Sequence, residues 1–193
     1  MVGDPETEAR AACAAGHWDR AVTALLGAYG QELLEYLIAV GRSEADGRDA
    51  YSRFAERLWR GLPRFRWDTS GRAWCYLVAR HALSEIKRAS PVRRARHLVP
   101  LSESPGLAAA DRTRTRTFLR TAARDAFAAA RAALSPRDQE LLVLRIDRRL
   151  AWRDIARILF DGEDGPALER RTVALRKRFE DLKTRLRAAV RAA

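Results

Sequence analysis

The chain has 193 residues, with 37 Lys or Arg against 25 Asp or Glu, so its formal net charge is +12. No apolar run reaches membrane-spanning length, and the N-terminus lacks the cationic start and apolar core of a secretory signal. Two isolated cysteines, Cys13 and Cys75, exclude a disulfide framework and a closed structural zinc site. The sequence therefore predicts a soluble, cytoplasmic protein without metal or other cofactor, and its charge favours nucleic acid as a partner.

Apolar residues recur at helical spacing in almost every segment, and no segment alternates as a strand does, which predicts an all-α fold. Three helices are expected in the first part, over residues 19–40, 43–62 and 71–88. Ser70 is a plausible cap of the third helix, and an aromatic and basic loop over 64–70 precedes it. These helices are expected to form a compact bundle with one shared core.

Residues 91–113 are expected to form a flexible linker, because Pro91 should end the third helix and Pro, Ser and Gly follow with little periodicity. A further helix over about 114–133 then opens the second part. The predicted organisation is two small helical domains, 1–90 and 114–193, joined by the linker.

The second domain is predicted to contain a helix-turn-helix. Ser135 is placed to cap a short helix, with Pro136 in its first turn and Asp138 three residues after the cap. A second short helix over 152–160 follows, and then a long helix from Pro166 with apolar residues on one side and cations on the other. Residues 118–193 hold 18 basic and 11 acidic side chains, so this domain carries much of the positive charge. Two short helices bracing a longer cationic one are typical of proteins that place a helix in the major groove of DNA.

Several stretches, in this order, resemble the extracytoplasmic-function sigma factors of bacterial RNA polymerase. Residues 58–66 (LWRGLPRFR) look like the end of that family's second conserved region, and residues 72–81 (RAWCYLVARH) look like its R-T-W-L-Y-x-I-A-R-N signature. Residues 134–145 (LSPRDQELLVLR) resemble the opening of its fourth region, and residues 150–156 (LAWRDIA) match L-S-Y-x-E-I-A. Residues 175–179 (LRKRF) match the start of its recognition helix. The resemblance covers about three-quarters of the chain.

The resemblance implies that the chain binds the clamp and flap regions of core RNA polymerase, recognises promoter DNA and helps to melt it. An inhibitory anti-sigma protein is a further partner that the family often has. The second helix of the bundle would face the clamp, and the candidate contacts on it are Asp49, Arg53, Glu56 and Arg57. The family usually has an acidic or amide pair where this chain has Ser52 and Arg53.

The loop and the third helix of the bundle would take the −10 element. Strand opening needs an aromatic surface for an extruded base and cations for phosphates, and Trp67 lies among arginines on the loop. Trp74 is expected to be mainly core. The candidate −10 residues are Arg64, Arg66, Trp67, Asp68, Ser70, Arg72, Arg80, His81, Lys87 and Arg88.

The long C-terminal helix would read the −35 element in the major groove, where an arginine can bind guanine bidentately. The candidate −35 residues are Arg171, Thr172, Ala174, Arg176, Lys177 and Arg178. The turn before this helix departs from the family, because it is several residues longer and carries Asp161, Glu163 and Asp164.

Two readings of function stay open at this point. The first is a sigma factor, and the alternative is a helix-turn-helix transcription regulator that never engages polymerase. An enzyme is disfavoured, because the three histidines are scattered and the sequence has neither a Gly-rich phosphate loop nor a metal-ligand cluster.

Overall fold

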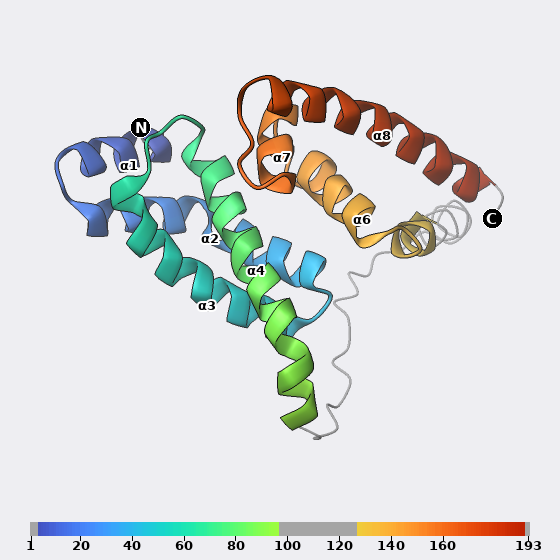
Figure 1. The fold of residues 1–193 in the computed structure, drawn as a ribbon, viewed down its shortest axis with the longest axis horizontal. Helices are drawn as coiled ribbons and strands as arrows, with labels where there is room; N and C mark the ends of the chain where they lie inside the picture. The colour runs from blue at the N-terminus through green and yellow to red at the C-terminus, as the bar shows by residue number, and fades with distance from the viewer. Residues whose placement is uncertain (1–3, 97–126, 192–193) are drawn as a thin grey trace, which may run out of the picture.

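The computed structural model describes residues 4–96 and 127–191, and these residues contain helices and no strand. The predicted all-α fold class is therefore confirmed for the described part of the chain. The helices fall into an N-terminal bundle and a C-terminal unit (Figure 1). The bundle consists of α1 (Pro5–Ala14), α2 (Trp18–Gly41), α3 (Glu44–Gly61), the 3₁₀ turn η1 (Leu62–Arg64) and α4 (Gly71–Arg96). The C-terminal unit consists of helical residues 127–132, α6 (Pro136–Leu142), the π-helical turn η2 (Val143–Asp147), α7 (Trp152–Leu159) and α8 (Gly165–Arg191).

Side-chain caps fix where α1 and α3 of the bundle begin. The Asp4 carboxylate accepts a hydrogen bond from the Thr7 amide, and Pro5 occupies the first turn of α1. Ser43 caps α3 by accepting from the Asp46 amide at 3.2 Å. The core of the bundle consists of fully buried side chains from α2, α3 and α4, among them Leu33, Phe54 and Tyr76.

The crossing of α2 and α3 depends on Gly47. A Cβ atom at this position would lie 2.8 Å from the Cα atom of Ile38, which is closer than packed carbon atoms approach. Glycine therefore allows the two backbones to come together, and this contact closes one side of the bundle.

Two predictions about the bundle need correction. Helix α1 was not expected as an element, although it packs against α2 and buries Ala9 and Ala12. The expectation that Pro91 ends the third helix is wrong, because α4 continues through it to Arg96. Proline lacks an amide hydrogen and costs a helix interior about 3 kcal/mol, but it does not by itself stop a long helix that is packed elsewhere. The rest of the predicted linker, and most of the helix expected over 114–133, lie outside the described residues.

The C-terminal unit forms largely as the sequence predicts. The Ser135 hydroxyl accepts from the Asp138 amide at 3.2 Å and donates to the Asp138 carboxylate at 2.8 Å, which starts α6. In Figure 1, α6 and α7 lie between the bundle and α8, and α8 forms the outer edge of the unit. Helix α7 contacts both α4 and α8, so it connects the bundle to the long cationic helix.

Candidate nucleic-acid interface

Helix α8 has one apolar and one cationic side. Leu168, Leu175 and Phe179 are 0–5% exposed and face α7 and α6. On the opposite side, exposed residues recur at spacings of three and four along the helix, which places them on one surface. These residues are Arg170, Val173, Ala174 and Lys177. The helix therefore presents a continuous row of exposed residues to solvent.

Three cations on or beside this surface are unpaired within the described part of the chain. No carboxylate of the described residues forms an ion pair with Arg170, Arg176 or Lys177, and all three side chains are exposed. Their charges are thus available to phosphates or base edges without first breaking an internal contact. Val173 is 65% exposed between them and was not a sequence candidate, although it offers an apolar contact of the kind that thymine methyl groups take.

Two other candidate arginines of α8 are held by neighbouring residues. The Arg171 guanidinium lies 3.2 Å from the Glu163 carboxylate and 4.4 Å from the centre of the Phe160 ring. Arg178 donates to the Asp138 carboxylate at 2.6 Å. Burial raises the pKa of Asp138, but hydrogen bonds from Arg178 and Ser135 outweigh it, so the pKa lies below its ordinary value. Arg171 and Arg178 would therefore have to exchange partners to bind DNA.

Thr172 does not belong to the outer surface. Its side chain is 5% exposed, and its hydroxyl donates to the Leu168 carbonyl at 2.8 Å. The prediction that Thr172 contacts DNA is therefore wrong, because α8 turns this position toward the core. Ala174 is exposed, as a base contact requires.

The loop before α4 holds its aromatic side chains together. Phe65 stacks on Trp74 with ring centres 4.4 Å apart, and the Trp67 ring lies 4.8 Å from that of Phe65. Trp67 has a φ of +58° and is half-buried, so it is not the freely exposed platform that the sequence suggests. Trp74, expected to be mainly core, is half-buried too.

Some polar residues of this loop are exposed, and others form hydrogen bonds within the fold. Arg64 and Arg66 are exposed and remain candidates for phosphates. Asp68 lies 3.6 Å from Arg66 and offers its carbonyl to Arg157 at 2.9 Å. Ser70 caps α4 by accepting from the Ala73 amide at 3.0 Å. The role of Ser70 is thus structural in this arrangement.

The candidates on α4 split into a covered and an open group. Arg72, Arg80 and His81 are engaged by carboxylates: Arg72 by Glu32 at 2.7 Å, and the other two by Asp161 at 2.9 and 3.2 Å. Lys87 and Arg88 are exposed near the far end of the helix, where Lys87 donates to the Val40 carbonyl at 2.9 Å. The two predicted DNA surfaces are therefore unequal, because α8 is open while the first half of α4 is covered.

The predicted polymerase face lies on α3. Asp49, Arg53 and Glu56 line a shallow depression of about 230 Å³ on this helix. Arg53 and Arg57 both contact Glu85 of α4, which orients them along the same side. This surface is polar and charged, as a contact with a charged partner requires.

Trp59 is a candidate that the sequence argument did not select. It is 51% exposed on the last turns of α3, whereas the buried positions of that helix, Phe54 and Leu58, are 0% exposed. Trp59 lies three residues after Glu56, which puts it on the polar side of the helix. This spacing in the sequence could have identified Trp59 as a candidate. An exposed tryptophan beside a charged face is typical of protein-binding surfaces.

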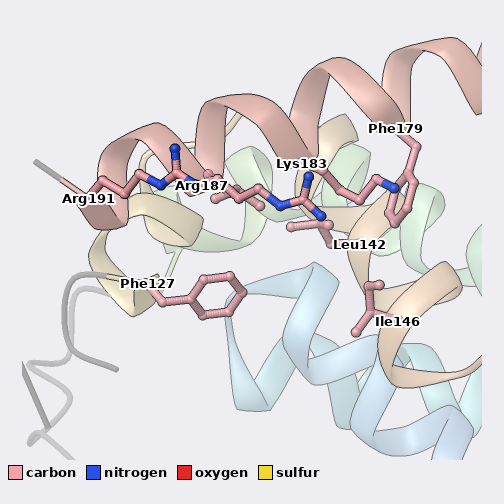
Figure 2. A pocket seen from close by; sticks show the side chains of 8 residues that line it. Phe127, Leu142, Ile146, Phe179, Lys183, Arg187 and Arg191 are labelled. Atoms are coloured by element: carbon pink, nitrogen blue, oxygen red, sulfur yellow. The ribbon is translucent and has the colours of Figure 1, made fainter. Parts of the chain in front are cut away.

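The C-terminal unit has an apolar groove of about 420 Å³ between α8 and the helices before it. Phe127 and Ile146 line it and are 42% and 54% exposed. Figure 2 shows both side chains facing α8 across the groove, with Lys183, Arg187 and Arg191 following α8. An apolar floor with a basic rim suits the apolar side of an acidic amphipathic helix.

No protein-family model, curated protein or solved structure matches the chain. Within the described ranges, no three His, Cys, Asp or Glu residues come close enough to hold a metal ion. None of the described helices combines the length and apolar character needed to cross a membrane.

Proposed function

We propose that this chain is a promoter-specificity subunit of bacterial RNA polymerase, similar to the extracytoplasmic-function sigma factors. It would bind core polymerase in the cytoplasm, recognise −35 and −10 promoter elements and promote DNA melting, with no catalytic chemistry of its own. The observation that carries the proposal is α8, which packs its apolar side against α6 and α7 and presents on the other side cations that no described carboxylate pairs with. This is the arrangement that places side chains in a major groove.

Two further surfaces support the proposed contacts with polymerase. The polar side of α3, with Trp59 at its end, is assigned to the clamp. The apolar groove is assigned to an acidic amphipathic helix of the flap, with its apolar side in the groove and its acidic residues against Lys183 and Arg187. Two separated contacts would fix both helical units on one polymerase.

Binding to core polymerase tests the proposal against its alternative. We expect the purified chain to form a stoichiometric complex with core polymerase in size-exclusion chromatography, and Trp59→Ala to weaken this complex about tenfold. A tenfold loss corresponds to about 1.4 kcal/mol, which is ordinary for one interface tryptophan. A chain that binds DNA but does not co-elute with polymerase would be the helix-turn-helix regulator instead.

One observation favours that regulator as the second candidate. Because Arg72, Arg80 and His81 are covered, α8 is the larger open cationic surface of the described chain. A protein that only binds operators needs one such surface and usually dimerises to read paired half-sites. The oligomeric state on DNA therefore adds a second discriminating measurement.

Two exposed aliphatic residues separate the protein and DNA surfaces of the C-terminal unit. Ile146→Glu should weaken polymerase binding about tenfold and leave duplex binding unchanged, since Ile146 lies in the groove. Val173→Glu should do the reverse, because Val173 lies on the cationic side of α8 and a carboxylate there repels phosphates. Fluorescence anisotropy with labelled duplex and labelled polymerase measures both. Equal effects of the two variants on both partners would contradict the assignment.

A further inference from the structure

Helix α1 reaches the start of α4 through Glu6. Oε1 of this carboxylate accepts a hydrogen bond from the Arg72 amide at 2.8 Å and another from the Tyr29 hydroxyl at 3.1 Å. The first amides of a helix have no carbonyl partner within the helix, so Glu6 satisfies one that α4 itself leaves open. A carboxylate also complements the positive end of the helix. Helix α1 therefore supplies part of the cap of α4.

The ring of Trp67 packs on the same turn of α4. A Cβ atom added to Gly71 would lie 3.2 Å from Cζ3 of Trp67 and 3.6 Å from the carboxyl carbon of Glu6, so the ring and the carboxylate both lie close to the Gly71 backbone. The other end of α1 contacts the same side chain through the Cys13 thiol. Burial raises the pKa of Cys13, and the Trp67 indole offsets part of this rise.

The backbone of Trp67 depends on these contacts. Its φ of +58° lies in the left-handed region, which a bulky residue adopts only where its surroundings hold it. Part of the ring nevertheless borders open space, because Trp67 lines a hollow of about 280 Å³ between α1 and the loop, together with Thr7 and Thr69. A ring that is already fixed beside such a hollow loses little freedom when a base stacks on it.

We propose that Glu6 is a positioning residue for the strand-opening loop, which holds the start of α4 and thereby keeps the Trp67 ring in the place where it receives an extruded base. The inference rests on the proposed function, because that function assigns an extruded base to Trp67. It also gives α1 a role, since this helix would determine how well the loop captures a base without touching DNA through Glu6.

The first measurement follows the Trp67 ring in the absence of DNA. In a nitrogen–proton correlation spectrum of the full chain, the Trp67 indole resonance is the one that Trp67→Phe removes. Glu6→Ala should shift this resonance and speed its exchange with solvent about tenfold, because the ring loses its fixed place. Glu6→Gln should leave it unchanged, since the amide oxygen still accepts from Arg72. Glu8→Ala, which removes an exposed carboxylate from the same helix, is the matched control.

The second measurement follows a base. The probe is a single strand of about 20 nucleotides of mixed sequence with 2-aminopurine in place of adenine, whose fluorescence falls when the base stacks on an indole. The background Arg176→Ala/Lys177→Ala reduces the contribution of α8. Trp67→Ala should abolish the quenching at saturation. Glu6→Ala should lose most of it and bind about tenfold more weakly, which is within the range for one base–aromatic stack, whereas Glu6→Gln and Glu8→Ala should keep both.

Circular dichroism checks that each variant keeps its helices. If Glu6→Ala loses helix content, Tyr29→Phe replaces it, because this variant removes the second hydrogen bond to Glu6 and keeps the ring. Tyr29→Phe should shift the Trp67 resonance in the same direction by a smaller amount.

The outcomes separate the inference from the function on which it rests. A Trp67 resonance that responds no more to Glu6→Ala than to Glu8→Ala would overturn the inference, as would equal losses in Glu6→Ala and Glu6→Gln. A shifted resonance with unchanged quenching would overturn it too. In each of these cases the proposed function stands if Trp67→Ala still abolishes the quenching. Quenching that survives Trp67→Ala would instead contradict the role assigned to the loop, and the inference would fall with it.

Discussion

Replacing Arg176 and Lys177 with alanine should lower the affinity for duplex promoter DNA by about 30- to 100-fold at physiological salt. Both side chains are exposed on α8, and no ion pair holds either of them among the described residues. Each phosphate that a cation neutralises contributes about −0.9 to the slope of log affinity against log salt. The variant should therefore also show a slope about two units shallower.

The salt slope distinguishes a direct contact from a general loss of charge. The double variant Arg10→Ala/Arg20→Ala removes the same charge from exposed positions of α1 and α2. It should change the affinity by less than about threefold, since these positions lie far from α8 in sequence and belong to the bundle. Equal losses in both double variants would mean that net charge alone, and not the α8 surface, binds the duplex.

Replacing Asp138 with alanine should destabilise the C-terminal unit by about 2–3 kcal/mol, the usual range for leaving a buried charge or cap without its partner. Asp138 is 6% exposed, accepts from Arg178 and Ser135, and fixes α8 against the start of α6. Thermal unfolding followed by circular dichroism measures the loss. Asp147→Asn is the matched control, because Asp147 pairs with Arg131 at the surface and should change stability by less than about 0.5 kcal/mol.

Asp138 also predicts a pH dependence. Its pKa is lower in the folded chain than the value of about 3.9 in an unfolded one, so the ionised form stabilises the fold. This contribution is fully present above pH 4 and is lost as the pH falls through the lowered pKa. The stability difference between the wild type and Asp138→Asn should therefore be constant from pH 5 to 7 and shrink below pH 4. A difference that grows toward acid pH would contradict the assigned contact.

The sequence predicts the helices well where local signals agree. Helix α6 begins where the predicted cap Ser135 and Pro136 place it, and α3 begins one residue after its predicted start at residue 43, with Ser43 as its cap. Helix α8 begins one residue before its predicted start at Pro166. These features depend on residues within a few positions of each other, which is why they can be read from the chain.

Other features depend on packing that the sequence pattern does not encode. Helix α1 is short and weakly amphipathic, and it is held by contacts with α2. Pro91 is expected to end a helix, yet α4 continues through it. The inward turn of Thr172, by contrast, could have been predicted, because Thr172 lies between Leu168 and Leu175 on the apolar side of α8.

The covered state of α4 could not be predicted at all. Arg80 lies 81 residues before Asp161 in the sequence, and their contact exists because α7 packs on α4. The sequence shows the length and acidity of the turn, but not which cations it meets. Long-range polar pairs of this kind are set by tertiary geometry, in contrast to caps and apolar stripes.

Run-off transcription by core RNA polymerase in the presence of this chain tests whether the chain directs initiation at promoters. On a library of bacterial promoter fragments, we expect defined run-off transcripts that appear only when polymerase and chain are combined, and that disappear with Arg176→Ala/Lys177→Ala. The same set of transcripts with and without the chain, although it binds DNA, would contradict a promoter-specificity subunit.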